Sequence, residues 1–423
     1  MIAKKSENIL LIILRFFREG KCFEAMSCLK RIFSGKEQSL LGLDLVQTLK
    51  QLRLENESEA CKKLNENTRQ SHPGWVELLC SLLQYYMERE RGSAQVIEHF
   101  ENLFKNSKWL LDEQRHEIYQ FLCKQVVTEQ YKIVQIMKRK AKDSEAVKEA
   151  SHAQEKLESK SLQIFQEMGR EVNIKNMQKL KLLNANQQMK IYFKAFKFDS
   201  AAACDKVEKE QNLLLASPKQ DQITYHYYKG RILIFDSKFY EASQHLTQVL
   251  QECPRTQKGL SCARQVLKYL IPINMFIGRY PNKELIDQFK EYELLCTSVR
   301  QGNISGLQEA IDKYRSIWIK RSLLILMDQL KVLCYRNLCR KVWLINQQAN
   351  KIHLEQFQKA FRISHPANSN PTISEVCCII ANLIYLELIR GHIYLNNEKN
   401  IYAITLSPQQ PFKDKPGEIK WQQ

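Results

Sequence analysis

Apolar positions recur at helical spacing along most of the chain. An apolar stripe over residues 10–33 is interrupted once, by a polar turn at 19–21, and further periodic segments follow at 75–87 and 118–137. Residues three and four apart lie on one face of a helix, so this pattern predicts amphipathic helices that pair into hairpins. We therefore predict an all-α fold for most of the chain.

The apolar pattern weakens between residues 138 and 160. Lys, Glu, Ala and Ser dominate this stretch, and large apolar side chains are nearly absent. A segment without an apolar face has little to bury, which favours a solvated helix or a loop. The sequence therefore predicts an exposed, charged insertion near 138–160.

A repeat-like spacing occurs in residues 223–254. Gly230, Ala242 and Pro254 follow one another at intervals of twelve residues. This spacing is typical of a tetratricopeptide repeat, in which small residues let two antiparallel helices approach and the Pro ends the second helix. A generic helical hairpin outside any repeat family is the alternative, and residues 20–29 show a weaker echo. Either interpretation predicts an α-solenoid, and the twelve-residue spacing favours a tetratricopeptide-like helical-repeat solenoid.

The pattern changes after residue 300. A turn at Gly302-Asn303 is followed by four predicted helices, at 305–314, 318–347, 354–361 and 373–389. Two short apolar segments flank an Asn-rich turn and predict a small β-hairpin, with strands at 391–394 and 401–404. Three helices closed by a β-hairpin predict a C-terminal winged helix.

These patterns divide the chain into four predicted parts. They are N-terminal helical repeats at 1–186, further helical repeats at 187–315, a winged helix at 316–407 and a tail at 408–423. The tail carries three Pro residues without periodicity, so we expect it to be extended or disordered.

Composition excludes several classes of protein. With 13 Gly, 10 Pro and 44% hydrophobic residues, the chain is neither collagen-like nor largely disordered. The 13 Cys are odd in number and include no CxxC pair, which favours reduced, buried thiols over disulfides or a zinc site. Arg15 and Arg18 interrupt the apolar N-terminal run, and nothing approaches the roughly 20 apolar residues of a membrane span. We expect a soluble intracellular protein.

Catalytic signatures are absent from the sequence. The nine His are scattered, and no HExxH, GxSxG, GxGxxG or GxxxxGK[ST] motif occurs. We therefore expect no enzyme activity, no cofactor and no metal site.

The charge of the chain is strongly basic and unevenly distributed. Of the net +18, residues 124–197 contribute +8 and residues 301–362 contribute +7. Clustered cations attract phosphates without reading sequence. The candidate nucleic-acid contacts in the second window are Lys313, Arg315, Lys320, Arg321, Arg336, Arg340 and Lys341.

Several alternatives remain open for these segments. Arg336 and Arg340 share a helix face, but Arg336 also sits among apolar residues and could face the core. Trp318, Tyr335 and Trp343 lie near the cations and could stack on bases, although their helical placement favours core packing. A basic membrane-surface helix is an alternative for 124–197. The helix at 373–390 carries only Arg390 as a base, which argues against sequence-specific DNA reading.

Several motifs resemble those of the PCI-domain family. They are Tyr228 with Gly230 and Arg231, the segment 269–272, Gly302-Asn303, the block 335–342 (YRNLCRKV), the segment 380–385 and the closing segment 406–412. The resemblance covers residues 187–415, and it is to the branch of the family that serves nuclear mRNA export and the signalosome.

This resemblance implies a non-catalytic scaffold in a heteromeric complex. The implied partners are a large scaffold subunit, a small acidic disordered subunit, and RNA or DNA bound without sequence specificity, with no membrane. The implied location is the nucleus, including the nuclear envelope or pores, with the cytoplasm as an alternative. The rival function is a protein-interaction subunit of a signalosome, proteasome-lid or initiation-factor assembly, with no direct role for nucleic acid.

Overall fold

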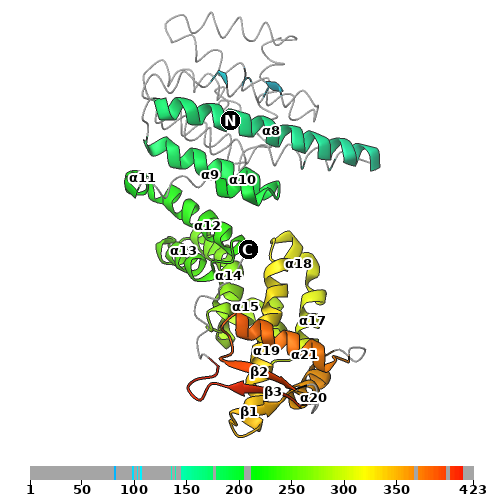
Figure 1. The fold of residues 1–423 in the computed structure, drawn as a ribbon. Coiled ribbons are helices and arrows are strands. Elements are labelled where there is room, and N and C mark those ends of the chain that lie inside the picture. Colours follow the sequence, from blue (N-terminus) through cyan, green and yellow to red (C-terminus); the bar gives the residue numbers. More distant parts are fainter. Residues whose placement is uncertain are drawn as a thin grey trace, which may run out of the picture. The chain divides into compact units, whose positions relative to one another are not determined.

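The computed structural model of the chain describes residues 144–174, 178–203, 211–365, 370–396 and 401–412, with a few isolated positions before residue 144 (Figure 1). The chain divides into two compact units, Met1–Pro218 and Lys219–Gln423. The helices predicted before residue 138, the echo at 20–29 and the tail beyond 412 lie outside the described residues. The predicted boundary after residue 186 falls inside a helix, and the boundary before 316 falls inside another.

The described part of the first unit is helical. It comprises α8 (Ser144–Ile174), α9 (Gln178–Lys194), α10 (Phe198–Ala203) and α11 (Gln211–Ala216). Helix α8 packs along α9, and both α10 and α11 contact α9. The described helices of this unit are thus gathered around α9.

The structure differs from the exposed insertion predicted near 138–160. Residues 144–160 belong to the long helix α8, and Ala150, Ala153 and Leu157 are buried along one of its faces. The stripe continues through Ser161 to Phe165, at the spacing of three and four residues that one helix face requires. Small side chains permit close helix packing, so Ala150 and Ala153 bury this face together with a single leucine, Leu157.

The second unit begins with three consecutive helices, α12 (Lys219–Phe235), α13 (Phe239–Glu252) and α14 (Gln257–Phe276). A Cβ at Gly230 of α12 would lie 2.7 Å from Cγ of Leu246 on α13, and Ala242 is fully buried. The last turn of α13 is followed by Pro254. The small residues do allow two helices to approach, which confirms the helical hairpin expected from the twelve-residue spacing.

A second set of helices leads to the winged helix. It comprises α15 (Lys283–Gln288), the short 3₁₀ helix η3 (Lys290–Tyr292), α16 (Glu293–Gln301), α17 (Ile304–Lys313) and α18 (Arg315–Lys320). Helices α16 and α17 form a hairpin around Gly302, which adopts a left-handed conformation with φ +69°. Asn303 caps α17, because its side-chain oxygen accepts a hydrogen bond from the Gly306 amide at 3.0 Å.

The C-terminal elements form the predicted winged helix. In chain order they are α19 (Leu324–Ile345), β1 (Lys351–His353), α20 (Leu354–Ser364), α21 (Ile373–Tyr385), β2 (Gly391–Asn396) and β3 (Ile401–Leu406). The strands form one antiparallel sheet in the order β1-β3-β2, beside the three helices (Figure 1).

Two details of the winged helix differ from the sequence-based prediction. The helix expected at 318–347 is two helices, α18 and α19, because the chain turns at Ser322 with φ +57°. Strand β1 was not predicted, since a single apolar residue, Ile352, lies between two polar ones. Its partner is Ile404 on β3. Long-range pairing defines this strand, and three residues alone carry too little periodicity to reveal it.

The hairpin at Gly302 is fixed to both α19 and α20. A Cβ at Gly302 would lie 2.7 Å from the Leu338 amide nitrogen of α19. The adjacent Asn337 donates a hydrogen bond at 2.8 Å to the Val299 carbonyl near the end of α16. On α20, the Ser364 hydroxyl donates to the Gly302 carbonyl at 2.7 Å and accepts from the Ile304 amide at 2.9 Å. We call this contact set the Gly302 joint.

The first part of the predicted tail is packed against the fold. Phe412 is 4% exposed, its ring centroid lies 5.5 Å from that of Trp343, and the Arg336 guanidinium lies over it at 5.9 Å. The Arg390 amide donates a hydrogen bond to the Pro411 carbonyl at 2.8 Å. Residues up to 412 are therefore part of the domain, which corrects the expectation of an extended or disordered tail for this portion.

The Gly302 joint yields a test of close packing. We expect Gly302→Ala to lower the free energy of unfolding by about 2–5 kcal/mol, from backbone strain at positive φ plus the clash with Leu338. Gly278→Ala is the matched control, since Gly278 also has a positive φ, of 85°, but is exposed. We expect this control to lose only about 1–2 kcal/mol. Equal losses in urea unfolding of the two variants would contradict the packing argument.

Two histidines meet between α12 and α13. The Nδ1 atoms of His226 and His245 are 2.8 Å apart and the rings stack, so one nitrogen donates its hydrogen to the other. Burial, followed by the proximity of His245, lowers the pKa of His226 to about 4. Glu252 opposes this shift in part, and Lys219 adds to it least. A charged His226 would be poorly solvated in this buried position, so the neutral form is favoured.

This histidine pair predicts acid sensitivity. Because the pKa of His226 is lower in the folded chain than in the unfolded one, the unfolded chain binds the proton first, and stability falls as pH drops from about 6.5 to about 4. We expect His226→Gln to remove roughly 1–3 kcal/mol of this pH dependence in urea unfolding. The exposed His152 provides the control, and His152→Gln should leave the pH profile unchanged. Identical profiles for all three proteins would refute the prediction.

Candidate nucleic-acid interface

Five of the seven predicted cations are exposed on α17 and α18 and on α19, the first helix of the winged helix. Lys313 ends α17, Arg315 and Lys320 lie on α18, and Arg340 and Lys341 lie near the end of α19. We call Lys313, Arg315, Lys320, Arg340 and Lys341 the helical cations. Their exposure leaves their charges accessible to a large anion.

Two of the helical cations make weak local contacts. Arg315 lies 3.9 Å from Asp312, and both side chains are more than half exposed. An exposed pair of this kind contributes little to stability and is easily exchanged for another anion. The Lys313 ammonium lies 5.5 Å from the centroid of the Tyr314 ring. Neither contact withdraws the charge from solvent.

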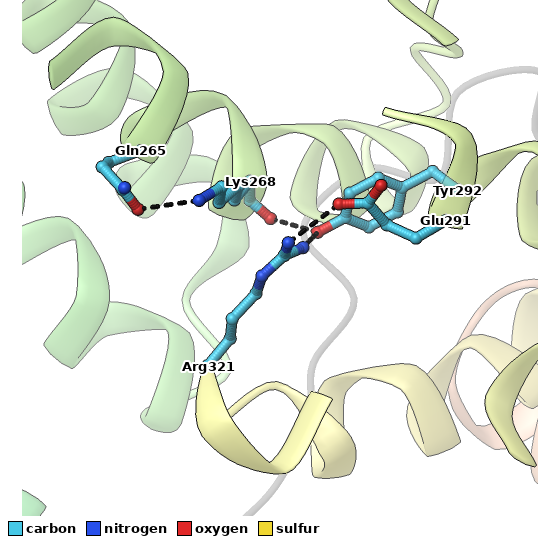
Figure 2. A network of polar contacts seen from close by, with 5 residues as sticks. All are labelled: Gln265, Lys268, Glu291, Tyr292 and Arg321. Carbon is cyan, nitrogen blue, oxygen red and sulfur yellow. Dashed lines mark hydrogen bonds and ion pairs between the residues drawn. The ribbon is translucent and has the colours of Figure 1, made fainter. Parts of the chain in front are cut away.

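Arg321 is held by a network of polar contacts, shown in Figure 2. Its guanidinium forms an ion pair with Glu291 at 2.8 Å and donates a hydrogen bond to the Tyr292 hydroxyl at 3.3 Å. The Tyr292 hydroxyl in turn donates to the Lys268 carbonyl at 2.5 Å. The Arg321 and Glu291 side chains are only 18% and 17% exposed. This residue therefore connects α14, η3 and the end of α18, and phosphate binding would require it to leave those partners.

The same network affects the ionisation of Tyr292. Burial raises the pKa of Tyr292 far above its usual value, and the neighbouring Arg321 opposes this effect only in part. The ring packs against Trp318, with centroids 5.2 Å apart. The Tyr292 hydroxyl thus remains a hydrogen-bond donor in the core at all ordinary pH values.

Arg336 is buried, as the alternative interpretation of its position allowed. The residue is 6% exposed, and its guanidinium donates a hydrogen bond to the Asn337 side-chain oxygen at 2.9 Å. This contact orients Asn337, whose amide binds the Val299 carbonyl in the Gly302 joint. Arg336 and Arg321 therefore act as structural residues, and the structure removes both from the accessible phosphate contacts.

The aromatic residues near the cations pack inside the domain. Trp318 is fully buried, Tyr335 stacks on Phe361 with centroids 5.6 Å apart, and Trp343 contacts Phe412. Core packing, the favoured alternative, is confirmed for all three. Trp318 is enclosed completely, whereas Tyr335 and Trp343 are partly buried and pack against the core.

The third helix of the winged helix has an almost uncharged outer face. Its exposed residues in α21 include Ser374, Cys378, Ala381, Asn382 and Tyr385. Glu375, at the start of the helix, is engaged in a capping box with Thr372. A helix without exposed Arg or Lys lacks the usual contacts to guanine and to phosphate. This geometry agrees with the expectation that α21 does not read bases.

Exposed cations outside the predicted set also occur in the winged helix. Lys359 and Arg362 are exposed on α20, and Lys351 is exposed on β1. Lys351 could not be assigned from sequence, because strand β1 itself was not recognised. All three lie inside the basic window at 301–362, but only the structure shows that their side chains face solvent.

No metal-binding or membrane-spanning feature emerges from the residues that the structure describes. In that part of the chain, no three His, Cys, Asp or Glu side chains come together as metal ligands. The described cysteines are free thiols, and burial raises the pKa of Cys296 and Cys334 to about 12. Among the same residues, no helix has the length and hydropathy needed to cross a bilayer.

In the second unit, helical hairpins continue directly into a winged helix. This order of elements places the described part of the unit among helical-repeat modules that end in a winged helix. Comparison with known families identifies which module of this class is present. Residues 307–399 match the PCI domain. The chain therefore contains a PCI domain, as its motifs indicated.

Three relatives describe the extent of the similarity. PCI domain-containing protein 2 of Xenopus laevis is 31% identical over 55% of this chain and 56% of its own length. Its Drosophila melanogaster homolog is 30% identical over 54% of this chain and 56% of its own length. Protein CSN12 homolog of Gibberella zeae is 24% identical over 44% of each chain. The chain thus spans about half the length of the curated relatives it matches.

The Arg321 network predicts a structural effect. We expect Arg321→Gln to lower the free energy of unfolding by about 1–3 kcal/mol, because Glu291 and the Tyr292 hydroxyl would lose a charged partner in a half-buried site. The neighbouring, exposed Lys320 is the control, and Lys320→Gln should change stability by less than about 0.5 kcal/mol. Urea unfolding followed by circular dichroism measures both. A variant at Arg321 as stable as the Lys320 control would show that the network is not needed for folding.

Proposed function

We propose that the chain is a non-enzymatic scaffold subunit of a nuclear mRNA-export complex, and that it contacts RNA or DNA phosphates without sequence specificity. The PCI domain and the relatives named PCI domain-containing protein 2 support the scaffold role. The observation that carries the nucleic-acid contact is the exposure of the five helical cations.

The proposed mechanism is electrostatic. Lys and Arg side chains near a phosphate backbone release condensed counterions, which favours binding at low salt. The helical cations lie on neighbouring elements, since α18 contacts both α17 and α19. The uncharged outer face of α21 accounts for the absence of base reading in this proposal.

The proposal includes partners and a location. The partners are a large scaffold subunit of the export complex and a small acidic disordered subunit, which the basic charge of the chain would attract. The location is the nucleus, with the cytoplasm as a second site. No catalytic role is proposed, because PCI domains generally serve as non-catalytic scaffolds and no catalytic motif occurs in the sequence.

A second candidate function is that of a protein-interaction subunit without nucleic-acid binding, in a signalosome, proteasome-lid or initiation-factor assembly. The observation in its favour is the relative named Protein CSN12 homolog. Identification of the proteins that co-purify with the full chain discriminates between the two candidates.

The helical cations provide the main test. We expect the triple variant Lys313→Glu, Lys320→Glu, Lys341→Glu to bind single-stranded RNA at least tenfold more weakly at low salt. The slope of log affinity against log salt should also become shallower by about 2, from about 0.7 per lost cation. Fluorescence anisotropy of a labelled oligonucleotide with the full chain measures both quantities.

A matched control separates local contacts from total charge. The triple variant Lys258→Glu, Lys283→Glu, Lys290→Glu changes the net charge equally, at exposed lysines of α14, α15 and η3. We expect a smaller loss for this control. If both triple variants lose the same affinity, or if wild-type affinity does not depend on salt, the proposed interface is wrong.

A further inference from the structure

The outer face of the winged-helix sheet carries an unusual set of side chains. Residues opposite one another in adjacent strands share a face, and successive residues alternate between faces. Lys351 pairs with Thr405, which also pairs with His392, and His353 pairs with Ala403, which also pairs with Tyr394. These two rows lie on one face of the sheet and cross all three strands.

Exposure identifies this face as the outer one. Lys351, His353 and His392 are exposed, and Tyr394 is 44% exposed. On the opposite face, Ile352 is 3% exposed and Ile404 is fully buried, and both belong to the domain core. We call Lys351, His353, His392 and Tyr394 the sheet-face residues. None of the residues in the three strands is acidic.

The sheet-face residues lie on the two outer strands, on either side of small side chains of the middle strand β3. Strand β3 lies between β1 and β2 and contributes only Ala403 and Thr405 to this part of the face. The Lys351 ammonium lies 5.5 Å from the centroid of the Tyr394 ring, so the contact reaches across β3 from one outer strand to the other. The result is an ammonium over one side of a partly exposed aromatic ring, with a His on each outer strand.

This combination fits a flat, anionic, aromatic ligand. An exposed Tyr on a sheet offers a π-face to a base, and a neighbouring ammonium offers an ion pair to the adjoining phosphate. Duplex bases are stacked on one another and present no such face, whereas the bases of a single strand do. The absence of acidic residues from the strands removes the main electrostatic obstacle to a polyanion.

We infer that the sheet face binds single-stranded nucleic acid, with Tyr394 stacking on a base, Lys351 contacting a phosphate, and His353 and His392 donating hydrogen bonds beside them. This inference deepens the proposed function, because it rests on the contact with nucleic acid and adds a site that the helical cations do not supply. It also implies that the sheet face binds single-stranded nucleic acid more tightly than a duplex. A docking protein is less well matched, since the centre of the face offers little apolar area.

The test measures binding of labelled oligouridine and oligothymidine of about 12 nucleotides to the full chain, with a DNA duplex as a third ligand. We expect Tyr394→Ala to weaken single-strand binding by about fivefold or more and Lys351→Ala by about threefold or more. Duplex binding should change by less than twofold for Tyr394→Ala. The RNA and DNA arms decide which single strand is preferred.

The controls are an exposed Tyr and an exposed Lys in the same winged helix. Tyr385→Ala, at a ring 63% exposed on α21, and Lys359→Ala, on α20, should each keep wild-type affinity within twofold. Crosslinking of oligo-4-thiouridine to the wild-type chain should label the peptide of β2 that contains Tyr394. This measurement stands even if a sheet variant fails to fold.

The outcomes separate this inference from the proposed function. If wild-type chain binds single strands but the two sheet variants bind equally well and β2 is not crosslinked, the sheet-face inference fails and the helical cations stand. If wild-type chain binds no oligonucleotide at low salt, both fail. If the sheet variants lose a co-purifying protein while keeping oligonucleotide affinity, the face is a protein-docking surface and the inference is overturned.

Discussion

The close approach of Gly302 to the backbone of α19 is the contact on which the arrangement of the second unit depends. With φ at +69°, Gly302 ends α16 and reverses the chain, and its missing side chain leaves room for Leu338. Asn337 and Ser364 then satisfy backbone groups of the same hairpin. A buried backbone group without a partner is costly, so these bonds fix the hairpin against both α19 and α20. The helical-repeat part and the winged helix are thereby one packed body at this point.

The same packing determines the role of each arginine. Arg336 follows Tyr335 in the family-like block and orients Asn337, so its charge serves the Gly302 joint from within the domain. Arg321 follows α18 as its C-cap and connects it to α14 and η3 through Tyr292 and Glu291. A charge held by buried partners is expensive to remove, because its partner would remain desolvated. Basic residues close together in sequence therefore separate into structural and accessible groups.

The accessible charges occupy helices and sheet rather than the third helix of the winged helix. The helical cations lie on α17, α18 and α19, and Lys351 lies on β1, while the outer face of α21 is almost uncharged. This distribution suits contacts to a phosphate backbone and leaves the recognition surface of a typical DNA-reading winged helix unused. A scaffold that holds a single strand while partner subunits determine specificity is consistent with this distribution.

Periodicity and turn residues were enough to predict the helical hairpins, the winged helix and the PCI resemblance, because these depend on local spacing. Examples are the small residue Gly230 in a helical hairpin, Gly302 at a helix end, and two apolar strands around a polar turn. Local pattern could not reveal strand β1, the buried face of α8 around Ala150, or the packing of Phe412, since each exists only through a partner distant in sequence. Nor could it separate Lys320 from Arg321. Two adjacent cations look alike in a sequence, and only the tertiary structure places Glu291 and Tyr292 beside one of them and solvent beside the other.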